Sequence, residues 1–309
     1  MRSAIGIWLV WMTLVGAPPV PAAEIPMPST VADGAELVAV YTAEKVFFEG
    51  PSWDPKTQKL YFTAFPNDKP TQILRLDGPQ KVFVWLDKTD GVNGTYLALD
   101  GRLLGAQAYG HRVVSYAIGP DGPSDTQVLV HDKSLFQPND VAQSITGDIY
   151  YTDPDFNKRE RSAVYHLAPS GKITRIIQDM AVPNGLKVSN DGRTLYVGDS
   201  HFKNWRAYPI LDDGSVGPGR VFFDPQTERR DDPDGMSIDE QGNLYLSGRG
   251  GVWVCDKFGR SLGLIPVSEF CSNVTFGGTD GKTLYLTCAG KVYSLQMKVR
   301  GGQFLREEN

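Results

Sequence analysis

Histidine and cysteine are scarce in this 309-residue sequence, which has four histidines and three cysteines. So few histidines leave little material for a zinc site built on imidazole ligands. The formal net charge is −5, and a chain of this charge lacks the basic surface that nucleic-acid binding needs, so no nucleic-acid partner is expected. The sequence also lacks a Gly-x-Ser-x-Gly motif, which argues against a serine esterase.

Long hydrophobic runs are missing as well. An uncharged stretch from Ala4 to Val15 follows Arg2 and leads into small residues that end at Ala23. This order predicts a secretory signal peptide over residues 1–23. An N-terminal membrane anchor is the alternative, but the stretch is shorter than the ~20 apolar residues that span a bilayer. We therefore expect the mature chain to be periplasmic or secreted, and not membrane-bound.

A strand that begins with a Leu-Tyr-like pair recurs six times at intervals of 40 to 49 residues. Its first apolar residues are Leu60, Leu103, Ile149, Leu195, Leu244 and Leu284. Turn residues such as Asp100-Gly101 precede most copies, and two further strands follow most of them. Four short strands about every 45 residues are typical of a propeller blade. The sequence predicts an all-β, six-bladed β-propeller with four-stranded antiparallel blades, forming a single domain over residues 24–309.

The ring needs a closing strand. No fourth strand remains after Gln296, whereas residues 36–41 have strand character and precede the first blade. We expect this N-terminal strand to become the outer strand of the last blade, because closure removes an exposed edge.

Polar residues open the innermost strand of each blade, where the strand starts converge on the propeller axis. They are Glu49, Asn93, Asn139, Asn184, Asp234 and Asn273. One Asn or Asp before Gly is usually only a turn, but six in phase predict a ring of oxygen donors. Buried carboxylates require a cation or a proton, and Asp140 adds a third acid to Glu49 and Asp234. Oxygen ligands favour Ca²⁺, with Mg²⁺, Mn²⁺ or Zn²⁺ as alternatives.

Several short motifs around these openings occur in a fixed order. They are Phe48-Glu-Gly-Pro51, Pro138-Asn-Asp140, Pro183-Asn-Gly185, Pro233-Asp-Gly-Met236 and Ser272-Asn-Val-Thr-Phe-Gly-Gly278. Together they resemble the regucalcin (senescence marker protein)/gluconolactonase/LRE-like family, and its microbial gluconolactonase-like branch in particular. The resemblance covers about residues 35–297. It implies a six-bladed propeller that uses one divalent metal ion to hydrolyse a lactone.

The resemblance also implies roles for individual residues. It places the metal ligands at Glu49, Asn184 and Asp234, and it makes Asp234 the general base. Asn139 corresponds to a residue that contacts substrate or completes the metal shell. Gln137 stands where animal members have an arginine that helps to hold the sugar, so the resemblance does not fix which lactone is the substrate.

The residues themselves agree with this chemistry. A metal polarises the lactone carbonyl while a nearby carboxylate takes a proton from water; Asp234 is the first candidate for this base and Asp140 the second. Substrate contacts are expected from Asn93, Asn139, Gln137, His201 and Arg249. We expect the pocket on the face of the loops that leave the second strands, because the opposite face should carry only hairpin turns. Asp153 and Asp199 lie in the same loops, and the alternative for each loop residue is a solvated side chain or a strand-end cap.

The three cysteines leave two alternatives. Cys271 and Cys288 flank one hairpin of the last blade and could form a disulfide, or all three, including Cys255, could be buried thiols. For function, the first hypothesis is an exported metal-dependent lactonase that acts on a small-molecule lactone. A metal-dependent esterase or phosphotriesterase on the same site is the second. The third is a non-catalytic ligand-binding propeller with a structural metal. The sequence does not indicate an oligomeric state.

Overall fold

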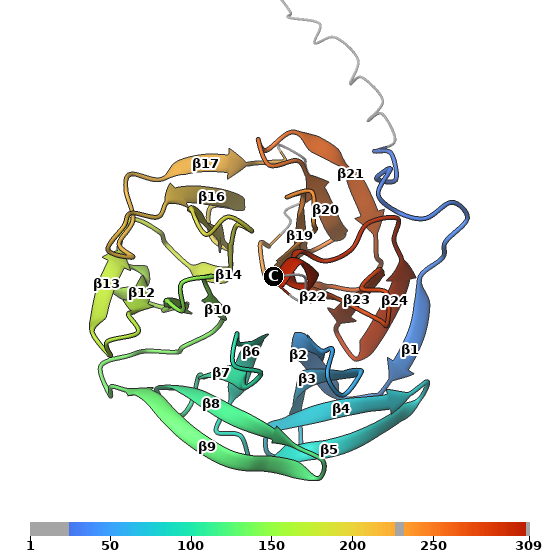
Figure 1. Ribbon diagram of the computed structural model, residues 1–309, viewed down its shortest axis with the longest axis horizontal. Coiled ribbons are helices and arrows are strands. Elements are labelled where there is room, and N and C mark those ends of the chain that lie inside the picture. Colours follow the sequence, from blue (N-terminus) through green and yellow to red (C-terminus); the bar gives the residue numbers. More distant parts are fainter. Residues whose placement is uncertain (1–24, 226–231, 307–309) are drawn as a thin grey trace, which may run out of the picture.

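The protein is a six-bladed wheel of β-strands around a central axis (Figure 1). The computed structural model describes residues 25–225 and 232–306, so the predicted signal peptide, residues 1–23, lies outside the described residues. These residues form six four-stranded antiparallel sheets, which confirms the predicted architecture. Within the same ranges, no helix is long and apolar enough to cross a membrane.

Five blades are each built from four consecutive strands that are ordered from the axis outward, and blade 6 combines three such strands with β1 (Val38–Thr42). Blade 1 contains β2 (Val46–Asp54), β3 (Lys59–Pro66), β4 (Gln72–Gly78) and β5 (Lys81–Asp87). Blade 2 contains β6 (Val92–Leu97), β7 (Leu103–Gln107), β8 (Arg112–Gly119) and β9 (Gly122–His131). Blade 3 contains β10 (Val141–Gln143), β11 (Ile149–Asp153), β12 (Ala163–Leu167) and β13 (Ile173–Ile177), with the short 3₁₀ helix η1 (Arg159–Arg161) in one loop.

The remaining blades follow the same plan. Blade 4 contains β14 (Pro183–Val188), β15 (Thr194–Asp199), β16 (Asn204–Pro209) and β17 (Arg220–Phe223). Blade 5 contains β18 (Met236–Ile238), β19 (Leu244–Gly248), β20 (Gly251–Cys255) and β21 (Ser261–Pro266). Blade 6 contains β22 (Cys271–Gly277), β23 (Thr283–Cys288), β24 (Lys291–Gln296) and β1 (Val38–Thr42).

The N-terminal strand closes the ring as predicted. β1 pairs antiparallel with β24, from Val38 opposite Ser294 to Thr42 opposite Lys291. Blade 6 therefore takes its inner three strands from the end of the chain and its outer strand from the beginning. β24 is therefore not left as an exposed edge strand, and the hydrogen bonds between β1 and β24 close the ring.

The recurring apolar residues of the second strands form the core between blades. Leu60, Leu103, Leu195, Leu244 and Leu284 are completely buried. A second strand is covered on both faces by neighbouring blades, which explains why its residues read as a short apolar run rather than an alternating pattern. Burying one such leucine contributes about 1.5–3 kcal/mol relative to an exposed side chain.

The C-terminal segment covers the hairpin face of the wheel. After β24 the described residues continue to the 3₁₀ helix η2 (Gly302–Arg306), which lies over the centre in Figure 1. Gly301 forms a β-bridge with Asp239 in the first hairpin of blade 5, and Phe304 lies close to Gly281 in the first hairpin of blade 6. No pattern in the sequence predicts this cap.

The cysteine alternatives are resolved by the pairing of β22 and β23. Cys271 lies opposite Cys288 in the ladder, and the two form a disulfide with a Cα–Cα distance of 4.1 Å. Cys255 is a free, buried thiol in blade 5.

Candidate active site on the propeller axis

The openings of the inner strands form two layers of side chains along the axis. In the ladders, Val141, Leu186, Met236 and Val274 occupy equivalent positions, each opposite the residue that lies two places after the recurring apolar residue of the second strand. Counting back two residues gives the upper layer: Glu49, Asn93, Asn139, Asn184, Asp234 and Ser272. The prediction that Asn273 opens the sixth strand is therefore wrong. Asn273 belongs with Asp140 in the layer one residue further along the strands.

The other blades have glycine in this lower layer because the neighbouring blade leaves no room for a side chain. A Cβ on Gly94 would overlap the Asp140 carboxylate, and a Cβ on Gly235 would overlap the Asn273 amide. Backbone hydrogen bonds join the same neighbours: the Gly94 N–H donates to Asn139 O at 2.7 Å. The Asn-Gly and Asp-Gly pairs of the sequence thus serve close packing at the axis, and Gly94 and Gly185 lie inside β6 and β14 rather than in turns.

Three buried carboxylates meet around the axis. Glu49, Asp140 and Asp234 are each less than 10% exposed. Burial raises the pKa of Glu49 to about 8, and the charge of Asp140 adds to this effect. Burial raises the pKa of Asp140 to about 6. The pKa of Asp234 is raised well above its ordinary value by burial, and then by repulsion from Glu49 and Asp140. A cation among them would relieve this repulsion.

The Asn184 side chain supports a metal site between these acids. Its Oδ1 atom is buried and has no hydrogen-bond partner, while its Nδ2 atom donates to Ser200 Oγ at 3.0 Å. A buried amide oxygen without a partner costs free energy unless a ligand takes it up. Among the described residues, no three His, Cys, Asp or Glu side chains are grouped to hold a metal by themselves. A centre here therefore needs the neutral Asn184 oxygen together with Glu49 and Asp234.

Ser200 is a positioning residue that the sequence analysis missed. Its hydroxyl accepts the Asn184 amide and donates to Pro233 O at 2.6 Å, so it ties blade 4 to the residue before Asp234. The only feature of the sequence that could have indicated this role is that a polar residue, Ser200, directly follows β15.

Two loop acids proved to be caps. The Asp153 carboxylate accepts the N–H groups of Phe136 and Gln137, and Asp199 accepts those of Ala181 and Val182. Each acid thereby fixes the loop that leads into the inner strand of its own blade, ahead of Asn139 or Asn184. This is the strand-end cap that the sequence analysis gave as the alternative.

The remaining predicted substrate residues lie at different depths. Asn93 is partly buried beside the ring, where its carbonyl oxygen accepts Thr63 Oγ1 at 2.8 Å, and Gln137 is partly buried. His201 is exposed and lies 3.2 Å from Arg159 Nη1. Arg249 is also exposed, and it pairs with Asp232 at 3.2 Å. The structure thus brings Asn93 and Asn139 to the axis, while His201 and Arg249 lie on outer loops of the same face.

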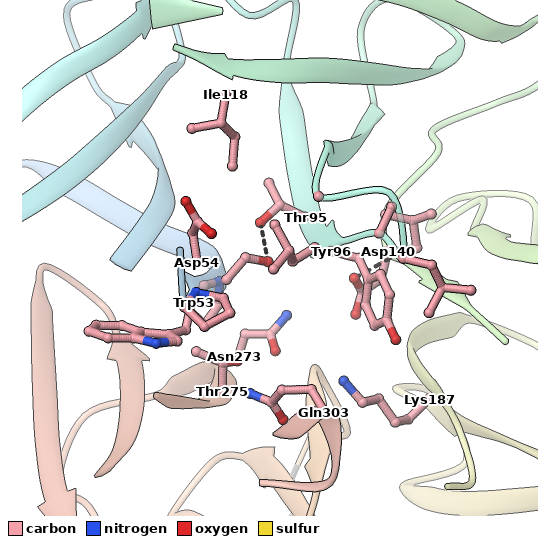
Figure 2. A pocket seen from close by; sticks show the side chains of 18 of the residues that line it. Trp53, Asp54, Thr95, Tyr96, Ile118, Asp140, Lys187, Asn273, Thr275 and Gln303 are labelled. Carbon is pink, nitrogen blue, oxygen red and sulfur yellow. Dashed lines mark hydrogen bonds between the residues drawn. The ribbon is translucent and has the colours of Figure 1, made fainter. Parts of the chain in front are cut away.

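A cavity of about 390 Å³ opens on the opposite, hairpin face (Figure 2). Its walls come from the first hairpins of blades 1 and 2, from Lys187 of β14 and from Gln303 of η2, and Asp140 and Asn273 line it as well. The Lys187 ammonium lies 4.9 Å from the centre of the Tyr96 ring. The expectation that this face carries only hairpin turns is wrong, because the C-terminal segment adds a wall.

Comparison with known proteins adds independent information. The family described as SMP-30/Gluconolactonase/LRE-like region matches residues 47–290. A gluconolactonase from Zymomonas mobilis is 27% identical over 89% of this chain and 85% of its own length. The pentonolactonase XacC from Haloferax volcanii is 27% identical over 78% of this chain and 81% of its own. The solved structure of a Xanthomonas campestris gluconolactonase superimposes with a TM-score of 0.74 at 26% identity, covering 89% of this chain and 94% of that one.

Proposed function

The chain belongs to the SMP-30/gluconolactonase/LRE-like family, and we propose that it is a divalent-metal-dependent lactonase that acts at the propeller axis. Two relatives named as lactonases align with most of the chain, which supports lactones as the substrate class. The observation that carries the metal requirement is the buried, unpartnered Oδ1 atom of Asn184 beside two buried carboxylates.

Glu49, Asn184 and Asp234 would hold the ion. Their oxygen ligands suit Ca²⁺ first, and also Mg²⁺ or Mn²⁺; Zn²⁺ is the remaining candidate. When bound, such an ion supplies Lewis-acid polarisation of the lactone carbonyl. Asn139, which is buried in the same layer, would contact the substrate beside it.

Asp234 is the better candidate for the general base, and the layered packing is the reason. Asp140 lies one residue further along the axis and lines the cavity on the hairpin face. A lactone that approaches from the loop face, where His201 and Arg249 lie, meets the layer of Asp234 first. Asp234 would take the proton of the attacking water, and Asp140 would hold Asn139 and the lower layer in place.

The test uses metal-free protein reconstituted separately with Ca²⁺, Mg²⁺, Mn²⁺ and Zn²⁺ and assayed on a panel of sugar lactones, alkyl lactones, aryl esters and phosphotriesters. We expect lactone hydrolysis that returns with at least one ion in wild type and not in Glu49→Gln. Glu44→Gln, which removes an exposed carboxylate five residues away, is the matched control. Turnover of aryl esters or phosphotriesters without turnover of any lactone would change the proposed substrate class. Ligand binding without any turnover would refute the proposal that the protein is an enzyme.

We also propose export of the mature chain. The N-terminal composition motivates it, and the Cys271–Cys288 disulfide supports an oxidising compartment. Mass spectrometry of the protein isolated from its natural source should give a mature N-terminus close to Glu24. An intact N-terminus in a cytoplasmic fraction would exclude export.

A further inference from the structure

The backbone just before Glu49 is held by blade 6 as well as by its own blade, in which Phe48 lies opposite Ala64 of β3. The N–H of Phe48 donates to the carbonyl oxygen of Ala289 at 2.9 Å. The carbonyl oxygen of Phe48 accepts the hydroxyl of Ser272 at 2.7 Å. Both peptide groups that flank Phe48 are therefore tied across the seam between the first and last blades, and the next side chain along the chain is Glu49.

Both blade 6 partners directly follow a cysteine of the disulfide. Ser272 follows Cys271, and Ala289 follows Cys288, so the two residues that hold Phe48 are adjacent to the two ends of one cross-link. Both cysteines are completely buried. Ser272 also donates to Thr287 O at 3.0 Å, and the Ala289 N–H donates to Phe270 O at 3.0 Å.

The ladder between these strands is weakened at this end. The register of β22 against β23 shifts between Cys271 and Asn273, and such a bulge interrupts the regular hydrogen bonds. Cys271 begins β22 and Cys288 ends β23, and strand ends are where local opening costs least. A covalent link at this point keeps Ser272 and Ala289 at a fixed separation although the ladder beside them is irregular.

We propose that the Cys271–Cys288 disulfide is a positioning element for the metal centre. It holds Ser272 and Ala289 as a clamp on the Phe48 backbone, and the clamp fixes the direction in which Glu49 enters the axis. This inference rests on the proposed function, because it assumes that Glu49 is a metal ligand. It assigns to the disulfide a role in metal affinity beyond the general stabilisation expected of a cross-link.

The experiment measures Mn²⁺ binding by titration calorimetry on the full chain. The variant is the double replacement Cys271→Ala and Cys288→Ala. The matched control is Cys255→Ala, which removes the buried free cysteine of blade 5 and leaves the disulfide of blade 6 intact. Substitution of a residue that orients a metal ligand typically weakens metal affinity by about 10–100-fold. We expect the dissociation constant to rise at least about tenfold in the double variant and to stay at the wild-type value in Cys255→Ala.

A second readout separates positioning from general loosening. Amide hydrogen exchange should accelerate at Phe48 in the double variant, while the amide of Val197 in β15 of blade 4 keeps its protection. A purely stabilising disulfide would instead lower protection in both blades through global unfolding.

Ser272→Ala provides a variant that keeps the cross-link and loses only the hydroxyl on Phe48 O. It should weaken Mn²⁺ binding in the same direction. Combined with the cysteine replacements, its effect should be less than additive, because both changes act through Phe48.

The outcomes are distinguishable. Wild-type protein that binds no divalent ion would refute the proposed metal site and this inference together. Wild-type protein that binds Mn²⁺, with an unchanged dissociation constant in the folded double variant, would overturn only the clamp. If the double variant fails to fold, Ser272→Ala decides, and wild-type affinity in that variant overturns the clamp.

Discussion

Asp140 and Gly94 occupy the same position of the repeat on adjacent blades, and only one of them has a side chain. The Asp140 carboxylate fills the space that a Cβ on Gly94 would need, and its Oδ1 atom accepts the N–H of Val141 at 2.9 Å. The sequence predicted Asp140 as an acid of the axis because it follows Asn139 directly. It could not predict the layer, since consecutive residues near a bulge do not alternate in the simple strand pattern.

Replacing Gly94 by alanine should therefore disturb Asp140. Added volume in a well-packed site costs about 1–3 kcal/mol, and we expect this loss of unfolding free energy in denaturant titrations. Gly78→Ala is the control, because nothing lies within 4 Å of a Cβ built there; its effect should stay within about 0.5 kcal/mol. Equal effects of both substitutions would contradict the close packing described for the axis.

Replacing the two candidate bases separately should distinguish their roles. Asp234→Asn should lose both metal binding and lactone hydrolysis, because it removes a ligand charge and the proposed base together. Asp140→Asn should keep the metal and lose less than about tenfold in kcat, since general-base catalysis is worth about 10²–10⁴-fold and is assigned to Asp234. A loss of about 10²–10⁴-fold in Asp140→Asn with intact metal binding would transfer the base to Asp140.

At the scale of strands, most of the fold could be predicted because each blade repeats one pattern. The apolar second strands, such as the one beginning at Leu60, are completely buried, so their composition marks them directly. In blade 6 the same pattern does not identify the residue that opens the inner strand. The bulge between Cys271 and Asn273 shifts the opening position to Ser272, and a serine does not stand out among acids and amides.

A pH-dependent contact belongs to the same blade. Glu269 accepts Lys291 Nζ at 2.6 Å, and this hydrogen bond lowers the pKa of Glu269 from 4.5 to about 2. A carboxyl group with a lowered pKa in the folded state stabilises the protein above its unfolded pKa, and the contribution is lost as the pH falls. Glu269→Gln should therefore be less stable than wild type at pH 7, and this difference should shrink as the pH falls from 4.5 towards 2.

Denaturant titrations at pH 7 and pH 3 measure this change. Glu44→Gln, which replaces an exposed carboxylate, controls for the loss of one negative charge. A difference between wild type and Glu269→Gln that is the same at both pH values would show that the pair does not titrate as described.

At the scale of the whole molecule, the sequence predicted the six-bladed ring but not the cavity on its hairpin face. The closing strand was visible because blade 6 lacked a fourth strand of its own. The cavity beside Asp140 combines hairpins of separate blades with Gln303 near the C-terminus. No local pattern records such a combination, because its parts are far apart in the chain. The proposed ligands have the same distribution: Glu49 lies in blade 1, Asn184 in blade 4, and Asp234 at the start of blade 5.

This distribution would make the proposed metal ion a link between blades, so its removal should lower the stability of the whole wheel. An ion present at 100 times its dissociation constant stabilises the folded state by about 2.7 kcal/mol. For a chain of this size, that corresponds to a rise in Tm of about 5 °C. We expect this rise in calorimetry when Ca²⁺ or Mn²⁺ is added to chelator-treated protein. Glu49→Gln should show no rise, because it lacks one ligand charge, whereas Glu44→Gln should respond as wild type does. The same rise in Glu49→Gln would place the stabilising ion elsewhere in the molecule, and no rise with any ion in wild type would refute the metal site on the axis.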